Sequence, residues 1–426
     1  MAKDFYDALE RRPSGEREQA LMQALPAQVA HAQARTVFGE ILGGATASAI
    51  DSREALARLP VTRKHELLER QIAARAARAG STGGAARPDV FGGFSSLAFG
   101  PAMPRVFASP GTLYEPEGTR KDYWRMARAM FAAGFRPGDL IHNSFSYHFV
   151  PAGSMMESGA HALGCTVFPG GTGQTEQQVQ AMAELGPAGY IGTPSFLKLL
   201  VEKSAELKLA LPTVTKALVS GEAFPPSLRD WLGTRGIAGY QCYATADLGL
   251  IAYETEAREG LVLDEGVIVE IVRPGTGDPV PEGEVGELVV TTLNPDYPLI
   301  RFGTGDLSAV LAGSCPTGRT NTRIKGWMGR ADQTTKIRGM FVHPGQVAAV
   351  ARRFPEVLRA RLVVSGEMAS DQMTLQVEAT EPSDDLNARI AEAVRDVTKL
   401  RANVEMHRPG SLPNDGKVIE DARSYK

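Results

Sequence analysis

The chain has only three cysteines among its 426 residues, Cys165, Cys242 and Cys315, which is too few and too scattered for a disulfide framework or a zinc site. No apolar run approaches the ~18 residues that a membrane-spanning helix needs, and the charged N-terminus lacks the apolar core of a signal peptide. A net charge of −3 gives no general attraction to nucleic acid. These absences predict a cytoplasmic protein with no membrane or nucleic-acid partner.

The residues that are abundant indicate a large globular enzyme-like chain. Hydrophobic residues make up 43% and charged residues 22%, which suits a sizeable buried core. The length predicts two or three structural units. Glycine occurs 45 times, which predicts many turns and loops whose backbone can approach a ligand closely.

Periodicity predicts a helical start followed by alternating strands and helices. Apolar residues recur at helical spacing in Glu16–Ala30 and Lys64–Ala77, within a helical segment that ends near Gly80. Strands are then predicted at Asp139–Phe145, Thr166–Phe168, Gly189–Ile191 and Ala217–Ser220. The helices between and around them are predicted at Tyr123–Ala133, Ser154–Leu163, Glu176–Leu185 and Ser195–Leu207. This alternation is typical of a mostly parallel sheet, whose ligands bind beyond the carboxyl ends of the strands.

The pattern changes after Leu261. The β-branched runs Val267–Val272 and Gly286–Thr292 predict an antiparallel or mixed β-subdomain over about residues 261–331. Beyond Asp332, two strands and the helix Asp384–Thr398 predict a separate α+β lobe. The expected fold is α/β: a large domain over residues 1–331, with a helical start at 1–80, and a small mobile domain over residues 332–426.

Two glycine turns carry most of the functional information. The first, Gly303–Asp306, places a carboxylate where it can accept hydrogen bonds from a diol. The second, Gly329–Asp332, precedes the basic segment Lys336–Gly339, whose charges suit phosphate or carboxylate. Together they predict a nucleotide site that spans a hinge. Two ordinary turns followed by a solvated edge strand are the alternative.

The order of these motifs resembles the adenylate-forming superfamily, and most closely its phenylacetate–CoA ligase branch. The matching segments run along nearly the whole chain: Phe5–Glu10, Leu59–Lys64, Gly134–Asp139, Asn143–Phe149, Gly192–Ser195, Pro298–Asp306, Gly329–Asp332 and Lys336–Gly339. The resemblance implies an AMP-forming acid–CoA ligase. Such an enzyme joins a carboxylic acid, here an aromatic one, to AMP from ATP with Mg²⁺ and then transfers it to CoA.

The resemblance also implies a nucleotide site. Its residues would be Ser109, Gly111, Thr112, Gly221, Glu222, Ala223, Tyr243, Thr245, Asp306 and Lys336. Asp306 would bind the ribose hydroxyls, although an Asp in such a turn also caps the turn itself. Tyr243 would stack on adenine, and a core aromatic is the alternative. Gly221 would let the backbone approach the base, and a plain strand-end turn is the alternative.

Further roles follow for the hinge and the small domain. Asp332 would be the hinge, and Arg330 would reach the ribose or phosphate unless it forms a surface ion pair. Lys417, which follows Asn414-Asp415-Gly416, would contact the carboxylate and the α-phosphate when the small domain closes. A solvated lysine is the alternative.

The acid pocket is expected between two strand ends. Its residues would be Tyr147, His148, Phe149, Gly192, Thr193 and Pro194. The aromatic rings would stack on an aryl acid. His148 is the histidine we select from seven, with a structural hydrogen bond in the core as the alternative.

Two segments depart from the family pattern. The phosphate loop, residues 108–118, has Glu115 where the family has lysine and Glu117 close by, so two carboxylates would face the polyphosphate unless Mg²⁺ intervenes. Ala246 replaces a hydroxyl residue, while Asp247 keeps a carboxylate that could hold the metal. No zinc is expected, since Cys315 is the one cysteine after the ribose-binding turn.

These departures leave two hypotheses open. The chain is an active ligase, or it is a diverged homologue that binds nucleotide or acyl-adenylate but adenylates poorly or uses another acceptor. A dinucleotide-binding dehydrogenase is disfavoured, because no Gly-x-Gly-x-x-Gly run follows an early strand. The sequence leaves a homodimer open.

Overall fold

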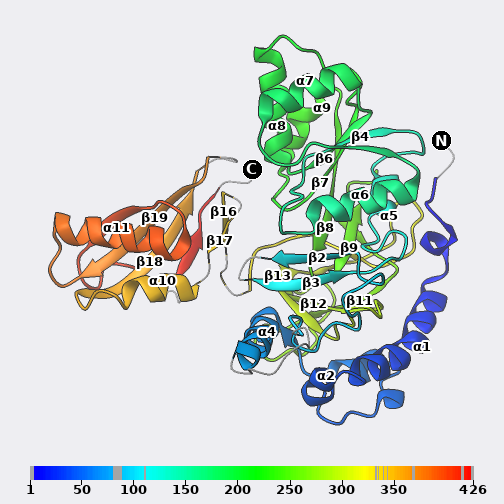
Figure 1. Cartoon of the computed structure of the whole chain (residues 1–426), viewed down its shortest axis with the longest axis horizontal. Coiled ribbons are helices and arrows are strands. Elements are labelled where there is room, and N and C mark those ends of the chain that lie inside the picture. The colour runs from blue at the N-terminus through cyan, green and yellow to red at the C-terminus, as the bar shows by residue number, and fades with distance from the viewer. Residues whose placement is uncertain are drawn as a thin grey trace. The chain divides into compact units, whose positions relative to one another are not determined.

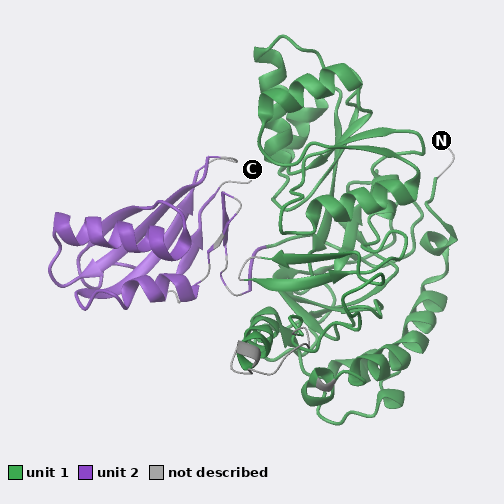
Figure 2. Ribbon diagram, viewed as in Figure 1, with its two compact units in different colours: residues 1–328 green, residues 329–426 purple. Residues whose placement is uncertain are grey.

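The computed structural model describes residues 4–79, 89–109, 112–331, 333, 335–338, 340–342, 344–366, 370–413 and 417–423. The chain forms two compact units, residues 1–328 and 329–426 (Figure 2). The sequence predicted a boundary between Ala331 and Asp332, and the hinge residue Asp332 lies outside the described residues. The position of the hinge therefore stays a prediction.

The first unit begins with helices, of which α1 and α2 lie at its lower right and α4 at its lower left in the view of Figure 1. Their bounds are η1 Ala8–Arg11, α1 Ser14–Gln33, α2 Thr36–Ile41, η2 Ala47–Ala49, α3 Arg53–Ala57 and α4 Lys64–Ala79. Helix α1 buries Leu21, Leu25 and Val29, which are four residues apart and therefore share one face. This face packs into a core that also contains strand residues of the same unit.

A nine-stranded sheet forms the centre of the first unit, in the order β14-β15-β10-β9-β8-β7-β6-β4-β5. Its strands are β4 Leu140–Asn143, β5 Thr166–Pro169, β6 Gly189–Gly192, β7 Lys216–Val219, β8 Ala238–Thr245, β9 Gly249–Glu254, β10 Leu261–Leu263, β14 Val310–Leu311 and β15 Arg323–Ile324. Strands β4 to β8 pair in parallel, as predicted, and β8 to β10 continue antiparallel. The connecting helices are α5 Ala127–Ala132, α6 Ala152–Leu163, α7 Thr175–Leu185, α8 Pro194–Glu206 and α9 Pro226–Gly233 (Figure 1).

The helix predicted over Tyr123–Ala133 is shorter than expected, because α5 begins only at Ala127. Asp122 accepts hydrogen bonds from the backbone N–H groups of Met126 and Ala127, at 2.8 and 3.0 Å. Arg125 has a φ of 63°, a left-handed conformation that no helix interior contains. The apolar periodicity of Tyr123 and Trp124 therefore reflects burial within a turn.

A second sheet has the order β1-β13-β12-β11. Its strands are β1 Thr62–Arg63, β11 Val267–Val272, β12 Gly286–Thr292 and β13 Phe302–Ser308, and a hairpin of β2 Arg105–Ser109 and β3 Leu113–Glu117 accompanies it. The predicted β-subdomain is thus divided, since β10, β14 and β15 join the nine-stranded sheet. Strand β1, from the helical start, pairs in parallel with β13. Sequence periodicity does not reveal such long-range partners.

The second unit is an α+β fold with its own core. Its sheet has the order β20-β19-β18-β21, and a hairpin of β16 and β17 precedes it. The bounds are β16 Thr335–Ile337, β17 Met340–Val342, α10 Pro344–Ala351, β18 Val357–Ser365, β19 Gln372–Ala379, α11 Asp384–Thr398, β20 Asn403–His407 and β21 Ile419–Asp421. Helix α11 spans the predicted residues and is capped by Ser383, whose side chain accepts a hydrogen bond from the N–H of Leu386.

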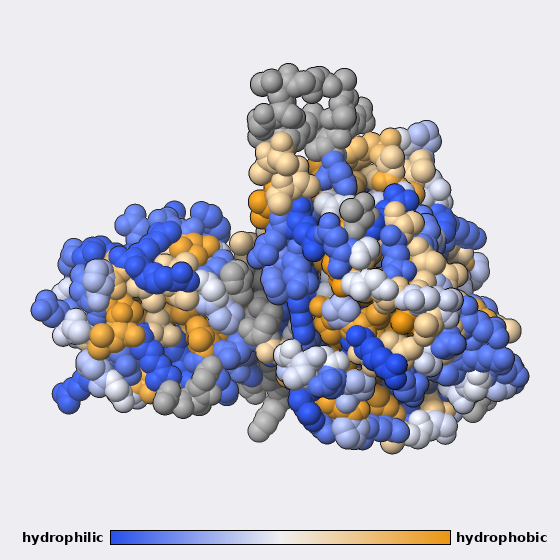
Figure 3. Space-filling model, turned by 90° about the horizontal axis from the view of Figure 1, so that it is seen from below, coloured by the Kyte–Doolittle hydropathy of each residue, from blue (hydrophilic) through white to orange (hydrophobic). Residues whose placement is uncertain are grey.

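Hydrophilic and hydrophobic residues are interspersed on the face that Figure 3 shows. Within the described parts of the chain, every helix is too short or too polar to cross a membrane.

Candidate functional site

Asp306, the carboxylate of the first glycine turn, lies on β13 and is held from two sides. The Tyr243 hydroxyl donates to its Oδ2 at 2.6 Å, and the Trp327 indole N–H donates to its Oδ1 at 3.1 Å. Its own backbone N–H donates to the Thr304 hydroxyl at 3.1 Å. These bonds orient the Asp306 carboxylate, which is an acceptor of the kind that a diol requires.

Arg301 anchors the chain immediately before this turn. It is almost fully buried and has a φ of 43°. Its guanidinium donates to Glu270 at 3.0 Å and to the carbonyls of Ala57 and Gly277 at 2.8 and 2.7 Å, and it also bonds the carbonyl of Leu59. One side chain therefore joins the helical start of the chain to the strand that carries Asp306.

Strand β1 brings a second basic segment to the same turn. Arg63 pairs in register with Gly303 and forms an ion pair with Glu287. The same Glu287 carboxylate accepts a hydrogen bond from the N–H of Gly305 at 3.2 Å. Lys64 comes next in the chain and is the first residue of α4. The sequence matched Lys64 to the family but assigned it no role.

Lys64 connects two carboxylates that the sequence treated separately. Its Nζ lies 2.8 Å from Oδ2 of Asp247 and 4.0 Å from Oε1 of Glu115. Asp247 is buried, and its other oxygen, Oδ1, has no hydrogen-bond partner. The Tyr297 hydroxyl is likewise buried without a partner. Orphaned buried oxygens of this kind mark a place where a ligand, ion or water belongs.

Glu115 is fully buried on β3. Its carboxylate accepts from the hydroxyl of Ser109 and, at 3.2 Å, from the N–H of Ser109. Burial above all, and then the charge of Asp247, raises the pKa of Glu115 above its usual range. The Glu115 carboxylate therefore turns inward onto the phosphate loop.

Glu117 differs from the expectation that it faces the polyphosphate. It is buried, pairs with Arg105 at 2.8 Å, and accepts from Trp124 Nε1 and the Ser154 hydroxyl, both at 2.9 Å. Its charge is thus satisfied inside the fold. Sequence adjacency misplaced it because the tight hairpin between β2 and β3 directs this part of the loop into the core.

The rest of the phosphate loop is partly described. Thr112 has a φ of 64°, and its N–H donates to the carbonyl of Ser109 at 3.0 Å. Gln71 of α4 holds the loop by both backbone groups of Tyr114, at 2.8 and 3.0 Å. The predicted Gly111 lies outside the described residues.

Other predicted residues gather at the carboxyl edge of the parallel strands. Gly221, Glu222 and Ala223 follow β7, and the Ser195 hydroxyl donates to Glu222 at 2.6 Å. Gly221 has a φ of 80°, which glycine adopts without strain. Thr245 ends β8, where its hydroxyl accepts from the N–H of Leu248 at 3.1 Å. This is the edge at which α/β sheets bind ligands.

The predicted acid pocket shares this edge. Gly192 ends β6, Thr193 precedes α8, and Pro194 begins it. Tyr147 is half-buried and its hydroxyl accepts from Asn143 Nδ2 at 2.8 Å.

His148 is exposed, so the core hydrogen bond considered as its alternative role is absent, and Phe149 is 81% exposed. The buried histidine is instead His142 on β4, which bonds Gln178 Oε1 at 2.7 Å and stacks on Phe168. Burial lowers the pKa of His142, so it favours the neutral imidazole. The sequence could have indicated His142 through its position next to Asn143, at the end of a predicted strand.

The remaining predicted residues belong to the second unit. Lys336 lies on β16, and its carbonyl accepts from Arg423 at 2.9 Å. Lys417 is exposed, beside Val418, whose N–H donates to Gln333 at 2.7 Å. Arg330 lies at the start of this unit and is half-buried. Their roles depend on the approach of the two units and stay predictions.

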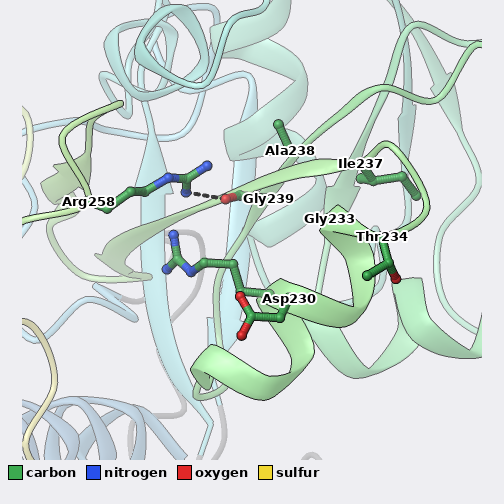
Figure 4. Close-up of a pocket in the computed structure, with 8 residues that line it drawn as sticks. Asp230, Gly233, Thr234, Ile237, Ala238, Gly239 and Arg258 are labelled. Atoms are coloured by element: carbon green, nitrogen blue, oxygen red, sulfur yellow. Dashed lines mark hydrogen bonds between the residues drawn. The ribbon is translucent and has the colours of Figure 1, made fainter.

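A separate hollow of about 490 Å³ lies by α9 and the amino end of β8 (Figure 4). Arg229 and Arg258 line it, but both pair with the buried Glu254, at 2.9 and 3.0 Å. Arg258 also bonds the carbonyl of Gly239 (Figure 4). Both arginines of this hollow are therefore paired within the fold. The hollow lies at the amino end of β8, whereas the candidate site lies at the carboxyl ends of the parallel strands.

Comparisons with known proteins agree with this geometry. Residues 120–294 match the family described as AMP-binding enzyme, and residues 339–422 match the AMP-binding enzyme C-terminal domain. The phenylacetate–coenzyme A ligase of Thermus thermophilus is 33% identical over 345 residues, which cover 72% of this chain and 78% of that protein. The chain belongs to the phenylacetate–CoA ligase family.

Two further relatives extend the comparison. The phenylacetate–coenzyme A ligase of Escherichia coli is 30% identical, over 74% of this chain and 77% of that protein. A crystal structure of 2-hydroxyisobutyryl-CoA ligase with 2-HIB-AMP and CoA, in its thioesterification state, superimposes with a TM-score of 0.79 at 25% identity, over 98% and 92% of the two chains. This phenylacetate–CoA ligase family member is thus an AMP-forming acid–CoA ligase with the adenylate-forming fold, for which ATP and CoA fit as substrates.

Proposed function

We propose that this ligase activates an aromatic carboxylic acid with ATP and transfers the acyl group from AMP to CoA. The observation that carries the proposal is the position of Asp306. Bonds from Tyr243 and Trp327 orient its carboxylate, and Lys64 and Asp247 follow elements that flank the same turn. A diol acceptor and a phosphate-sized cluster of charges are what a nucleotide requires.

Different residues of the site contact the ribose, the adenine and the phosphates of the nucleotide. Asp306 accepts from the ribose hydroxyls, and Tyr243 lies against adenine. Backbone at Gly221, Glu222 and Ala223 lines the base. The loop residues Ser109, Gly111 and Thr112, together with Thr245, contact the phosphates. These roles rest on the family motifs, and the contacts within the first unit support them.

Magnesium is proposed at Asp247. The unpartnered, buried Oδ1 suits a hard cation, although Lys64 already neutralises Oδ2. No cluster of three or more His, Cys, Asp or Glu side chains suits a metal in the parts of the chain that the structure describes. Asp247 would therefore hold the ion through its Oδ1. When bound, it would neutralise phosphate charge.

The chemistry has two displacements. A carboxylate oxygen of the acid attacks the α-phosphorus, the bond to pyrophosphate breaks, and an acyl-adenylate forms. The thiolate of CoA then attacks the acyl carbon, and AMP leaves. Lys417 and Arg330 supply positive charge to the first displacement, Lys336 contacts the nucleotide, and Asp332 is the hinge about which the second unit turns. Positioning and charge neutralisation account for such catalysis.

The acid is proposed to be aromatic because the pocket edge carries aromatic side chains. Tyr147 is anchored by Asn143, while the exposed Phe149 has a ring available for stacking on an aryl group. Gly192, Thr193 and Pro194 lie at the end of the neighbouring strand β6, and His148 adds a polar group at the entrance. The names of the two phenylacetate–coenzyme A ligases above support this class of acid.

The test is pyrophosphate release by the purified protein with ATP, Mg²⁺, CoA and a panel of aryl and alkyl acids. Release that depends on an aryl acid and on CoA supports the proposal, and an Asp306→Ala variant should release little. Release only with alkyl acids would refute the aromatic assignment. No release from any acid, together with no binding of ATP in calorimetry, would refute the ligase itself.

A second function is favoured by one observation. Glu115 stands where the family carries a lysine, and its carboxylate occupies the Ser109 donors of the phosphate loop. The chain would then bind acyl-adenylate yet adenylate poorly. Thioester formation from supplied acyl-adenylate, but none from acid and ATP, supports this alternative. A cytoplasmic location and a homodimer remain predictions, which fractionation and light scattering would test.

A further inference from the structure

We propose that Lys64 is the cation that grips the β- and γ-phosphates of ATP in this chain, in place of the phosphate-loop lysine that Glu115 has replaced. The inference rests on the proposed function, because it assigns the phosphate-binding half of the same nucleotide site. It turns an apparent defect of the loop into a relocation of its charge.

The pairing of β1 with β13 places Lys64 on the correct side of the nucleotide. Arg63 is in register with Gly303, three residues before Asp306, and Lys64 directly follows Arg63. A ribose bound at Asp306 therefore has the start of α4 beside it. This placement follows from backbone register and does not depend on any charge.

The charges nearby point to the same role. Lys64 Nζ contacts Asp247 at 2.8 Å and approaches Glu115 to 4.0 Å. Among the ion pairs of the described residues, no other cation joins either carboxylate. The Lys64 side chain is 44% exposed, so phosphate can reach it from solvent, whereas Glu115 is wholly buried. A compact ammonium on a flexible stem is a common phosphate ligand.

The fold holds this ammonium at a fixed position relative to the loop. Glu66 accepts from the N–H of Arg63 at 2.9 Å, which fixes the start of α4. One turn and a half further on, Gln71 binds both backbone groups of Tyr114, the residue before Glu115. Helix α4 and strand β3 are thus joined by side-chain bonds. Lys64 and the loop should therefore bind the polyphosphate as one unit.

The displaced donors of the loop explain why another cation is needed. The Ser109 N–H and hydroxyl both donate to Glu115 in this structure. In a loop that ends in lysine, groups of this kind would donate to phosphate. Glu115 therefore removes one positive charge and occupies two donors, and Lys64 is the adjacent group that can restore the charge.

The experiment is calorimetric titration of the full-length protein and of Lys64→Ala with ATP–Mg²⁺ and with AMP. We expect Lys64→Ala to weaken ATP about 10- to 100-fold, the range for losing a charged hydrogen bond. AMP, which lacks the β- and γ-phosphates, should bind within about twofold of the wild type by the same reasoning. Lys64→Arg should retain most of the ATP affinity.

Two further variants make the result specific. Lys203→Ala is the matched control, because Lys203 pairs with Glu206 in the last turn of α8, whereas the pocket residue Pro194 begins that helix. Its ATP affinity should equal that of the wild type. Lys64→Ala combined with Glu115→Lys returns an ammonium a few ångströms away and should recover ATP affinity. If Lys64→Ala folds poorly, Lys64→Gln carries the same comparison.

The outcomes separate this inference from the proposed function. If the wild type forms the acyl-CoA product and both Lys64→Ala and Lys64→Gln bind ATP as tightly as the wild type, the proposed role of Lys64 is wrong. The proposed ligase function is then unaffected. Equal losses for ATP and AMP also overturn it, since they indicate a structural role. A wild type that binds neither nucleotide overturns both proposals.

Discussion

The hydroxyl of Tyr243 donates a 2.6 Å hydrogen bond to Oδ2 of Asp306. Tyr243 lies on β8 of the nine-stranded sheet, and Asp306 lies on β13 of the four-stranded sheet. This bond therefore joins two sheets at the candidate site. It also fixes a carboxylate that would otherwise rotate, which is useful where a ribose must be held in one orientation.

Tyr243→Phe tests that relationship. The ring remains, so the proposed stacking on adenine should persist, while Asp306 loses the hydrogen bond that orients its Oδ2. A single hydrogen bond contributes about 0.5–1.5 kcal/mol, so AMP and ATP should both bind about 2- to 10-fold more weakly. Calorimetric titration measures this. Affinity unchanged for both nucleotides would show that Trp327 alone orients Asp306.

Arg301→Ala tests the anchor beneath the site. The substitution leaves the buried Glu270 carboxylate and three backbone carbonyls without their partner. Breaking a buried ion pair in this way costs about 3–5 kcal/mol. The midpoint of urea unfolding should therefore shift to a much lower urea concentration. Arg273→Ala is the control, because its ion pair with Glu284 is exposed and should contribute about 1 kcal/mol or less.

The sequence predicted the elements better than their partners. Short apolar runs and helical patterns located the parallel strands and α11, because local burial dictates those patterns. The pairing of Arg63 with Gly303 joins residues far apart in the chain, and no local pattern encodes it. For the same reason the β-rich segment after Leu261 was read as one subdomain, whereas its strands divide between two sheets.

The same limit applies to the candidate site. Motif order was enough to select Asp306 and Tyr243, and the structure brings them into contact. Motif order showed Glu115 and Asp247 only as residues of two separate segments that depart from the family pattern. Their shared neighbour, Lys64, was visible only in three dimensions. The role of His148 stays a prediction; that His148 is exposed while His142 is buried depends on how a strand end turns, which motif order does not show.

Asp122 gives a prediction for pH. Burial is the largest effect and raises the pKa of Asp122 to about 6, although its backbone hydrogen bonds lower that pKa. Of the two charges that face Asp122, Asp264 raises the pKa and Arg125 lowers it. Because the folded pKa lies above the unfolded value, the folded state holds an extra proton between about pH 4 and 6. Stability contributed by Asp122 is therefore present below pH 4 and is lost as pH rises through 6.

Asp122→Asn cannot ionise and should not lose this stability. Relative to the wild type, the variant should gain roughly 2–3 kcal/mol between pH 4 and pH 6.5, the value of a shift of about two pKa units. Urea unfolding of both proteins across this range measures the difference. A difference that stays flat with pH would show that the pKa of Asp122 is the same in the folded and the unfolded protein.

Lys417→Ala separates the two displacements. The lysine is proposed to contact the carboxylate and α-phosphate only during adenylation, so its removal takes positive charge from the first transition state alone. Pyrophosphate release from acid and ATP should fall about 100-fold or more, in line with the loss of one preorganised charged donor. Thioester formation from supplied acyl-adenylate and CoA should stay within about threefold of the wild type, because that step does not use the lysine.

Lys399→Ala, on the same unit at the end of α11, is the control and should leave both rates unchanged. A comparable loss in both half-reactions would place Lys417 in the fold of the second unit, whereas no loss in either would leave it a solvated side chain.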